Sequence, residues 1–270
     1  ADGDEIGVTL VEMPESGQAH GATYDGLGVD DGYWNVKYYA TGDGEEQTWT
    51  SDTPIMLSST LGQAVAYYPY AGTQNDYKAL EITSEGQTDY LYSGWEDADG
   101  INNAAPTTTF VMKHALSAVR LTLKRGSYSY TGEVTAASIS SEGFGVEGSL
   151  DASTGEITGV TGNAAVTTAM NNDFTALTIP TLTTESVNTL LMVVPVQGVA
   201  VDAVNGLGMD IEVTIDGKQY TLTGKMTEEF KSGYIYNFEL TLNNTALKVT
   251  KVSVTPWEEE TAVGGDLNPA

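Results

Sequence analysis

The chain has 270 residues, of which 40% are hydrophobic and 18% charged, so it contains enough apolar side chains for packed cores. At about 150 residues per domain, this length predicts two domains. The 37 acidic and 11 basic residues give a net charge of -26, which excludes nucleic acid as a partner because phosphate-binding surfaces need clustered Lys and Arg. Since the chain has no cysteine, disulfides, thiolate metal sites and cysteine nucleophiles are also excluded.

The sequence gives little direct information about export. It has no recognisable signal peptide and no apolar run of the ~20 residues that a membrane-spanning helix needs. The first five residues, Ala-Asp-Gly-Asp-Glu, include no initiator Met, which indicates a processed precursor or a recombinant form.

Strand patterns dominate the first half. Ile6, Val8 and Leu10 alternate with other residues at the period of two that is typical of strands, and residues 34–38 do the same. Residues 64–70 predict a strand that stops at Pro69, because proline cannot donate a ladder hydrogen bond.

Residues 110–123 are compatible with a helix or a strand. The alternation of Val119, Leu121 and Leu123 favours the strand. The preceding segment, residues 95–106, is polar, rich in turn residues and without periodicity. It is therefore the expected domain boundary.

The second half contains the clearest hairpin. Met209, Ile211, Val213 and Ile215 alternate up to Asp216-Gly217, a dipeptide that favours a two-residue turn, and an apolar face continues on the return strand. Residues 190–196 are almost continuously apolar, as expected for a strand buried on both faces. Residues 227–233 predict a helical turn.

Two more strands are expected near the C-terminus. Residues 234–242 alternate, and Leu247 and Val249 begin a last strand that continues with Val252 and Val254. The apolar parity changes between Val249 and Val252. A β-bulge or bend near residues 250–251 would place both pairs on the core face.

These patterns predict an all-β protein of two β-sandwich domains in tandem. Residues 1–105 form the first domain and residues 106–257 the second. Residues 258–270 form an acidic, Gly-rich tail.

The sequence offers little evidence for enzymatic chemistry, and no cofactor is expected. Residues 143–148 match G-x-G-x-x-G but do not open a helix, so they are interpreted as turn glycines. His20 and His114 lie far apart in sequence and outside any metal-ligand spacing, and His114 is expected to be a satisfied, partly buried histidine. We therefore expect no catalytic residues.

Two binding sites remain open. Asp97 and Asp99 precede a turn glycine and two asparagines, an oxygen-rich pattern that suits Ca²⁺, although the Glu that closes an EF-hand loop is missing. A solvated linker is the alternative. The 15 Tyr and 4 Trp residues include candidates for stacking on sugars, or they simply pack on half-buried strand surfaces.

Five segments together resemble the fimbrillin-like pilins, which are subunits of type V pili in anaerobic gut and mouth bacteria. The order and spacing of these segments span almost the whole chain: residues 66–70, 89–92, 110–119, 233–238 and 252–257.

The resemblance implies transthyretin-like sandwiches, export as a lipoprotein precursor, and assembly at the cell surface and outer membrane by donor-strand exchange with other pilin subunits. A protease removes an N-terminal strand in such pilins, and a strand from a neighbour replaces it. The displaced strand would carry Ile6, Val8 and Leu10. The donor would be the C-terminal stretch with Leu247, Val249, Val252, Val254, Val263 and Leu267.

The chain departs from this family in two respects. Well-studied members are cleaved after Arg or Lys, whereas the first basic residue here is Lys37, inside an expected strand. The acidic, Gly-rich tail also makes a poor donor strand, which favours a tip or accessory subunit with an adhesive role. The alternative function is a cell-surface adhesin or glycan-binding lipoprotein that does not polymerise and that recognises a host or bacterial surface glycan or protein.

Overall fold

The computed structural model describes residues 3–15, 20, 24, 33–42, 48–162, 166–167, 177–179, 186–202, 206–257 and 260–262. This part of the chain is all-β, as expected, and its only helical element is the 3₁₀ turn η2 at Glu85–Gln87. The helical turn expected at residues 227–233 is wrong. There the Tyr236 hydroxyl donates to the carbonyl of Glu229 and accepts from the backbone N–H of Lys231, which holds the loop open around buried Phe230.

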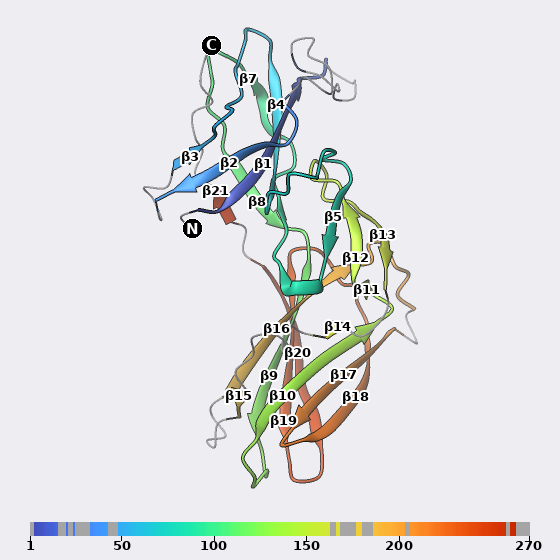
Figure 1. Ribbon diagram of the computed structural model, residues 1–270. Helices are drawn as coiled ribbons and strands as arrows, with labels where there is room; N and C mark the ends of the chain where they lie inside the picture. The colour runs from blue at the N-terminus through green and yellow to red at the C-terminus, as the bar shows by residue number, and fades with distance from the viewer. Residues whose placement is uncertain are drawn as a thin grey trace.

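The N-terminal part of the chain and the C-terminal strand β21 together build an eight-stranded sheet, which occupies the upper part of Figure 1. Its strand order is β21-β8-β6-β4-β1-β2-β3, and β7 also pairs with β4. The strands are β1 (Glu5–Glu12), β2 (Val36–Thr41), β3 (Thr48–Thr50), β4 (Gly62–Tyr68), β6 (Leu91–Tyr92), β7 (Glu96–Ile101), β8 (Phe110–His114) and β21 (Glu260–Ala262). As expected, β4 stops directly before Pro69.

A small sheet of β13 (Ile157–Thr161), β12 (Glu147–Leu150) and β5 (Leu80–Thr83) lies between the upper and lower parts of the molecule (Figure 1). It helps to bury a core cluster against the eight-stranded sheet, with residues such as Val65, Leu80, Leu116 and Leu150. Because β5 pairs with β12, and β8 belongs to the first sheet, strands on both sides of residue 105 share sheets. The domain division at residue 105 stays a prediction.

The segment expected to be an irregular linker contains a strand. β7 covers half of it and pairs with β4, and the register shifts between Gly62 and Ala64. The irregular pairing explains the missing periodicity, because a strand that departs from its ladder does not keep a regular alternation of faces.

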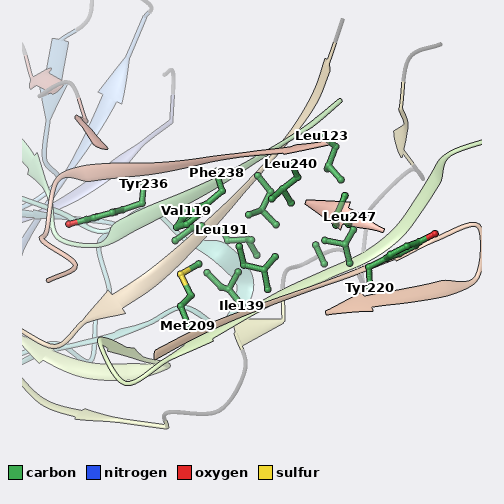
Figure 2. Close-up of a cluster of buried hydrophobic side chains, with 14 of the residues drawn as sticks. Val119, Leu123, Ile139, Leu191, Met209, Tyr220, Tyr236, Phe238, Leu240 and Leu247 are labelled. Carbon is green, nitrogen blue, oxygen red and sulfur yellow. The ribbon is translucent and has the colours of Figure 1, made fainter. Parts of the chain in front are cut away.

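Two five-stranded sheets face each other in the lower part of Figure 1. One has the order β11-β16-β9-β19-β20, and the other has β14-β10-β17-β18 with β15 also on β10. The strands are β9 (Ser117–Arg125), β10 (Glu133–Ser141), β11 (Phe144–Gly145), β14 (Val166–Thr167), β15 (Leu177–Thr178), β16 (Ser186–Pro195), β17 (Leu207–Ile215), β18 (Lys218–Met226), β19 (Tyr234–Leu242) and β20 (Leu247–Pro256). Figure 2 shows the core between them, to which both sheets contribute.

The expected hairpin is confirmed as β17 and β18. Asp216 and Gly217 have φ angles of 48° and 74°, the positive values that a tight two-residue turn requires. The Asp216 carboxylate accepts hydrogen bonds from the backbone N–H groups of Gly132 and Glu133 and from the Tyr128 hydroxyl. Burial tends to raise the pKa of Asp216, but these hydrogen bonds outweigh it and lower the pKa below its ordinary value.

The expected bulge in the last strand is also confirmed. Glu239 pairs with Lys251 and Leu240 with Val249, so Thr250 is the additional residue. The prediction that the bulge places both apolar pairs on the core face is only half right. Leu247 is buried, but Val249, Val252 and Val254 are 43%, 47% and 36% exposed, because β18 does not reach far enough across to cover them.

Candidate functional site

β1 lies in the interior of the eight-stranded sheet, with β2 on one side and β4 on the other. It is antiparallel to both, and Val8, for example, pairs with Val36 and with Ala66. Ile6, Val8 and Leu10 are 5%, 2% and 1% exposed. The three residues that the sequence singled out therefore share one buried face and belong to one core cluster.

The opposite face of β1 is buried too, which sequence reasoning missed. Thr9 is 3% exposed and Val11 is fully buried in the cluster shared with the small sheet. A side chain at Gly7 would overlap the ring of Tyr67, whose hydroxyl donates to Asn35 Oδ1 at 2.6 Å. Burial raises the pKa of Tyr67 to about 12, so this hydroxyl keeps its proton at neutral pH. The almost continuous apolar run Ile-Gly-Val-Thr-Leu-Val was the signal for burial on both faces.

The C-terminal segment connects two sheets. β20 is paired with β19 in the lower sandwich, whereas β21 pairs with β8 at the edge of the upper sheet, opposite Phe110 to Met112. Between them, the Trp257 ring stacks on the His114 ring at a centroid distance of 4.0 Å. The Trp257 backbone N–H donates to the carbonyl of Gly233 at 2.7 Å. Trp257 thus fixes the point at which the chain passes from one sheet to the other.

His114 is buried, 4% exposed, and its Nδ1 lies 3.0 Å from Asp89 Oδ1. This confirms the expectation of a satisfied histidine. Of the candidate donor residues, Val263 and Leu267 lie outside the described residues.

The calcium site at Asp97 and Asp99 stays a prediction. Asp97 and Asp99 lie within β7, and their side chains are outside the described part of the structure. Elsewhere in the described chain, no three His, Asp or Glu side chains are grouped closely enough to hold a metal ion.

The remaining sequence motifs do not converge on a site. Residues 143–148 lie across the short strands β11 and β12 with no helix after them, so they do not form a dinucleotide-binding loop. The interpretation as turn glycines is right for Gly143 only, because Gly145 and Gly148 lie within the strands. Among the described aromatic residues, Tyr130 and Tyr234 are exposed by more than a third. They lie at opposite ends of the parallel pair β9 and β19, so they do not form one stacking surface. No helix in the described chain is long and apolar enough to cross a membrane.

The fold and the positions of β1 and β21 define a class of protein. It is an all-β protein in which the first strand lies in the interior of a sheet and the last segment connects two sheets. A fimbrillin-like family model matches residues 1–257. The chain therefore belongs to the fimbrillin-like family.

Two solved structures with a similar fold come from Bacteroides species. A proposed cell adhesion protein of Bacteroides uniformis has a TM-score of 0.64 at 22% identity, with 95% of this chain and 93% of that chain covered. One of Bacteroides ovatus has a TM-score of 0.64 at 20% identity, with coverages of 96% and 89%. No curated protein matches the chain. At these identities the structural similarity establishes the fold alone.

Proposed function

We propose that the chain is a subunit of a cell-surface fimbria that assembles by exchanging β-strands with neighbouring subunits. β1 is the displaced strand, and a neighbouring subunit supplies its replacement. The observation that carries the proposal is the position of β1, which is paired on both sides and buried on both faces. Its removal would leave the backbone edges of β2 and β4 unpaired and open the apolar slot that holds Ile6, Val8 and Leu10. Such a slot must be filled, because unpaired buried backbone groups are costly.

An added strand would satisfy both requirements. Main-chain hydrogen bonds to β2 and β4 would supply affinity, and alternate apolar side chains would fill the slot and set the register. The proposed donor is the C-terminal segment from residue 247 to residue 267. Its first part already forms edge strand β20, which pairs with one of the described strands only, β19. A strand at the edge of a sheet can leave by breaking the hydrogen bonds to one neighbouring strand.

The acidic, Gly-rich composition of residues 258–270 favours a tip or accessory subunit over a stalk subunit, because such a sequence makes a weak donor strand. In this proposal the upper and lower parts are transthyretin-like sandwiches in tandem. The subunit reaches the outer membrane as a lipoprotein precursor and acts there by assembly, without catalysis.

The test compares the full chain with a truncated chain that starts after Met13. Both are examined by size-exclusion chromatography and by unboiled SDS gel electrophoresis, alone and with a synthetic peptide covering residues 1–13. Strand exchange predicts SDS-resistant oligomers of the truncated chain only, and their suppression by the peptide. The control is a peptide of the same composition in which the three apolar residues of the buried face no longer alternate. It should not suppress the oligomers.

A truncated chain that remains a soluble monomer, with or without peptide, would refute strand exchange. The non-polymerising adhesin would then be the better interpretation. A screen of this monomer against surface glycans would test that function directly.

A further inference from the structure

A groove opens along one side of the lower sandwich, between the edge strands β18 and β20. Among the strands that the structure describes, each of these is paired on one side only, β18 with β17 and β20 with β19. The groove has a volume of about 940 Å³. Its floor includes the core residues Met209, Ile211 and Phe238. Figure 2 shows Met209 and Phe238 on facing sheets, with Leu247 farther along the same core.

One wall of the groove is an uncovered apolar stripe. Val249, Val252 and Val254 line it, and the bulge at Thr250 is what keeps Val249 on the same face as the other two. All three are more than a third exposed. These valines continue the buried face of the strand that begins at Leu247, yet the opposite sheet ends at β18 and leaves them open. One more strand beside β18 would cover them.

The other wall offers a backbone edge for such a strand. Ile215 and Lys218 flank the two-residue turn and pair with each other, so the hydrogen bonds of β18 to β17 use residues 218, 220, 222, 224 and 226. The intervening residues of β18, such as Thr223, then direct their N–H and C=O groups away from β17. β18 is nine residues long and presents these groups along its length.

The charges at the groove indicate which strand would fit. Lys225 and Lys248 line it, and neither forms an ion pair with any residue that the structure describes. Glu228 is the one acidic residue among the described residues that line the groove. Two cations at one groove stand out on a chain with 11 basic and 37 acidic residues. They favour an acidic occupant, because charge complementarity sets partner choice and orientation at an interface.

We propose that the groove between β18 and β20 binds an extended acidic polypeptide strand from a neighbouring protein, with apolar side chains at alternate positions. The strand pairs with the free edge of β18, its inward side chains cover the three valines, and its carboxylates meet Lys225 and Lys248. This site is separate from the slot of β1 in the upper sheet and goes beyond the proposed strand exchange. It is present while β1 is still in place.

The probe is a fluorescein-labelled nine-residue peptide, Glu-Val-Thr-Val-Asp-Val-Thr-Val-Glu, added to the full-length chain. We expect saturable binding by fluorescence polarisation and slower amide hydrogen exchange in β18 and β20. Two control peptides should bind at least ~10-fold more weakly because each lacks one feature that the groove recognises. One has Lys in place of the three acidic residues, and the other has the same composition without alternation.

Variants of the chain test the location. Val252→Lys puts a charge on the apolar wall and should weaken binding at least ~10-fold. Thr255→Lys adds the same charge to the outward face of the same strand, and its binding should stay within about 2-fold of the parent chain. Thr223→Pro removes an outward N–H without removing a bond to β17, and it should also weaken binding at least ~10-fold.

Several results would overturn the proposal. They are the absence of saturable binding at millimolar peptide, equal binding of the Lys peptide, or exchange protection confined to β1, β2 and β4. Dimerisation of the full chain that Val252→Lys abolishes would assign the groove to a second copy instead. The proposed strand exchange is judged separately, because its assay needs the truncated chain and this one uses the intact chain.

Discussion

The burial of β1 predicts a large energetic difference between two leucines. Leu10 is 1% exposed within β1, whereas Leu61, directly before β4, is 44% exposed. Leu10→Ala loses the transfer free energy of the removed carbons and leaves a cavity that β2 and β4 prevent from collapsing. We therefore expect a cost of about 3–5 kcal/mol, in the upper part of the range for buried leucines. Leu61→Ala removes the same atoms from a half-solvated site and should cost less than about 1.5 kcal/mol.

Urea unfolding followed by tryptophan fluorescence measures this difference. All four tryptophans lie in or against the upper sheet: Trp49 in β3, Trp34 and Trp95 against its core, and Trp257 stacked on β8. With an m-value of about 3 kcal/mol/M, the midpoint should fall by about 1–1.7 M for Leu10→Ala and by less than about 0.5 M for Leu61→Ala. Equal shifts in the two variants would refute the conclusion that β1 is locked into the sheet.

Three further predictions concern single contacts. Gly7→Ala should destabilise the upper sheet by about 1–3 kcal/mol in the same urea assay, because the new methyl group meets the Tyr67 ring. Asp216→Asn should lower stability at pH 7 by about 1 kcal/mol. The pKa of Asp216 is lower in the folded state than its unfolded value of 3.8, so the ionised carboxylate stabilises the fold above that pKa. This stability is lost as the pH falls through the folded-state pKa. The difference in Tm between the variant and the parent chain should therefore narrow below pH 4. Trp257→Ala removes a stack on His114 worth about 1 kcal/mol, and hydrogen exchange should become faster in β21, whereas unchanged exchange would show that the stack does not hold this segment.

The sequence was a good guide to several features that depend on neighbours along the chain, although the helical turn expected at residues 227–233 was wrong. The Asp216-Gly217 turn, the alternation in β17 and the stop at Pro69 were all predicted, because positive φ angles, a period of two and a missing N–H are local properties. The bulge at Thr250 was predicted for the same reason, since a change of apolar parity shows it directly.

Three features depended on distant parts of the chain. Periodicity identified Ile6 as part of a strand, but only the pairing with β2 and β4 placed that strand inside a sheet, between residues that are far away in sequence. The same pattern predicted a buried Val252, and the structure leaves it exposed, because burial depends on whether the opposite sheet extends far enough to cover it. The passage of the chain at Trp257 from β20 to β21 has no local signal either. Sequence alone thus identified the strands that have a regular alternation, such as β17, but not the irregular strand β7. The tertiary structure decided which strands are interior, which edges are free and which apolar faces remain uncovered, because these depend on contacts between residues far apart in the chain.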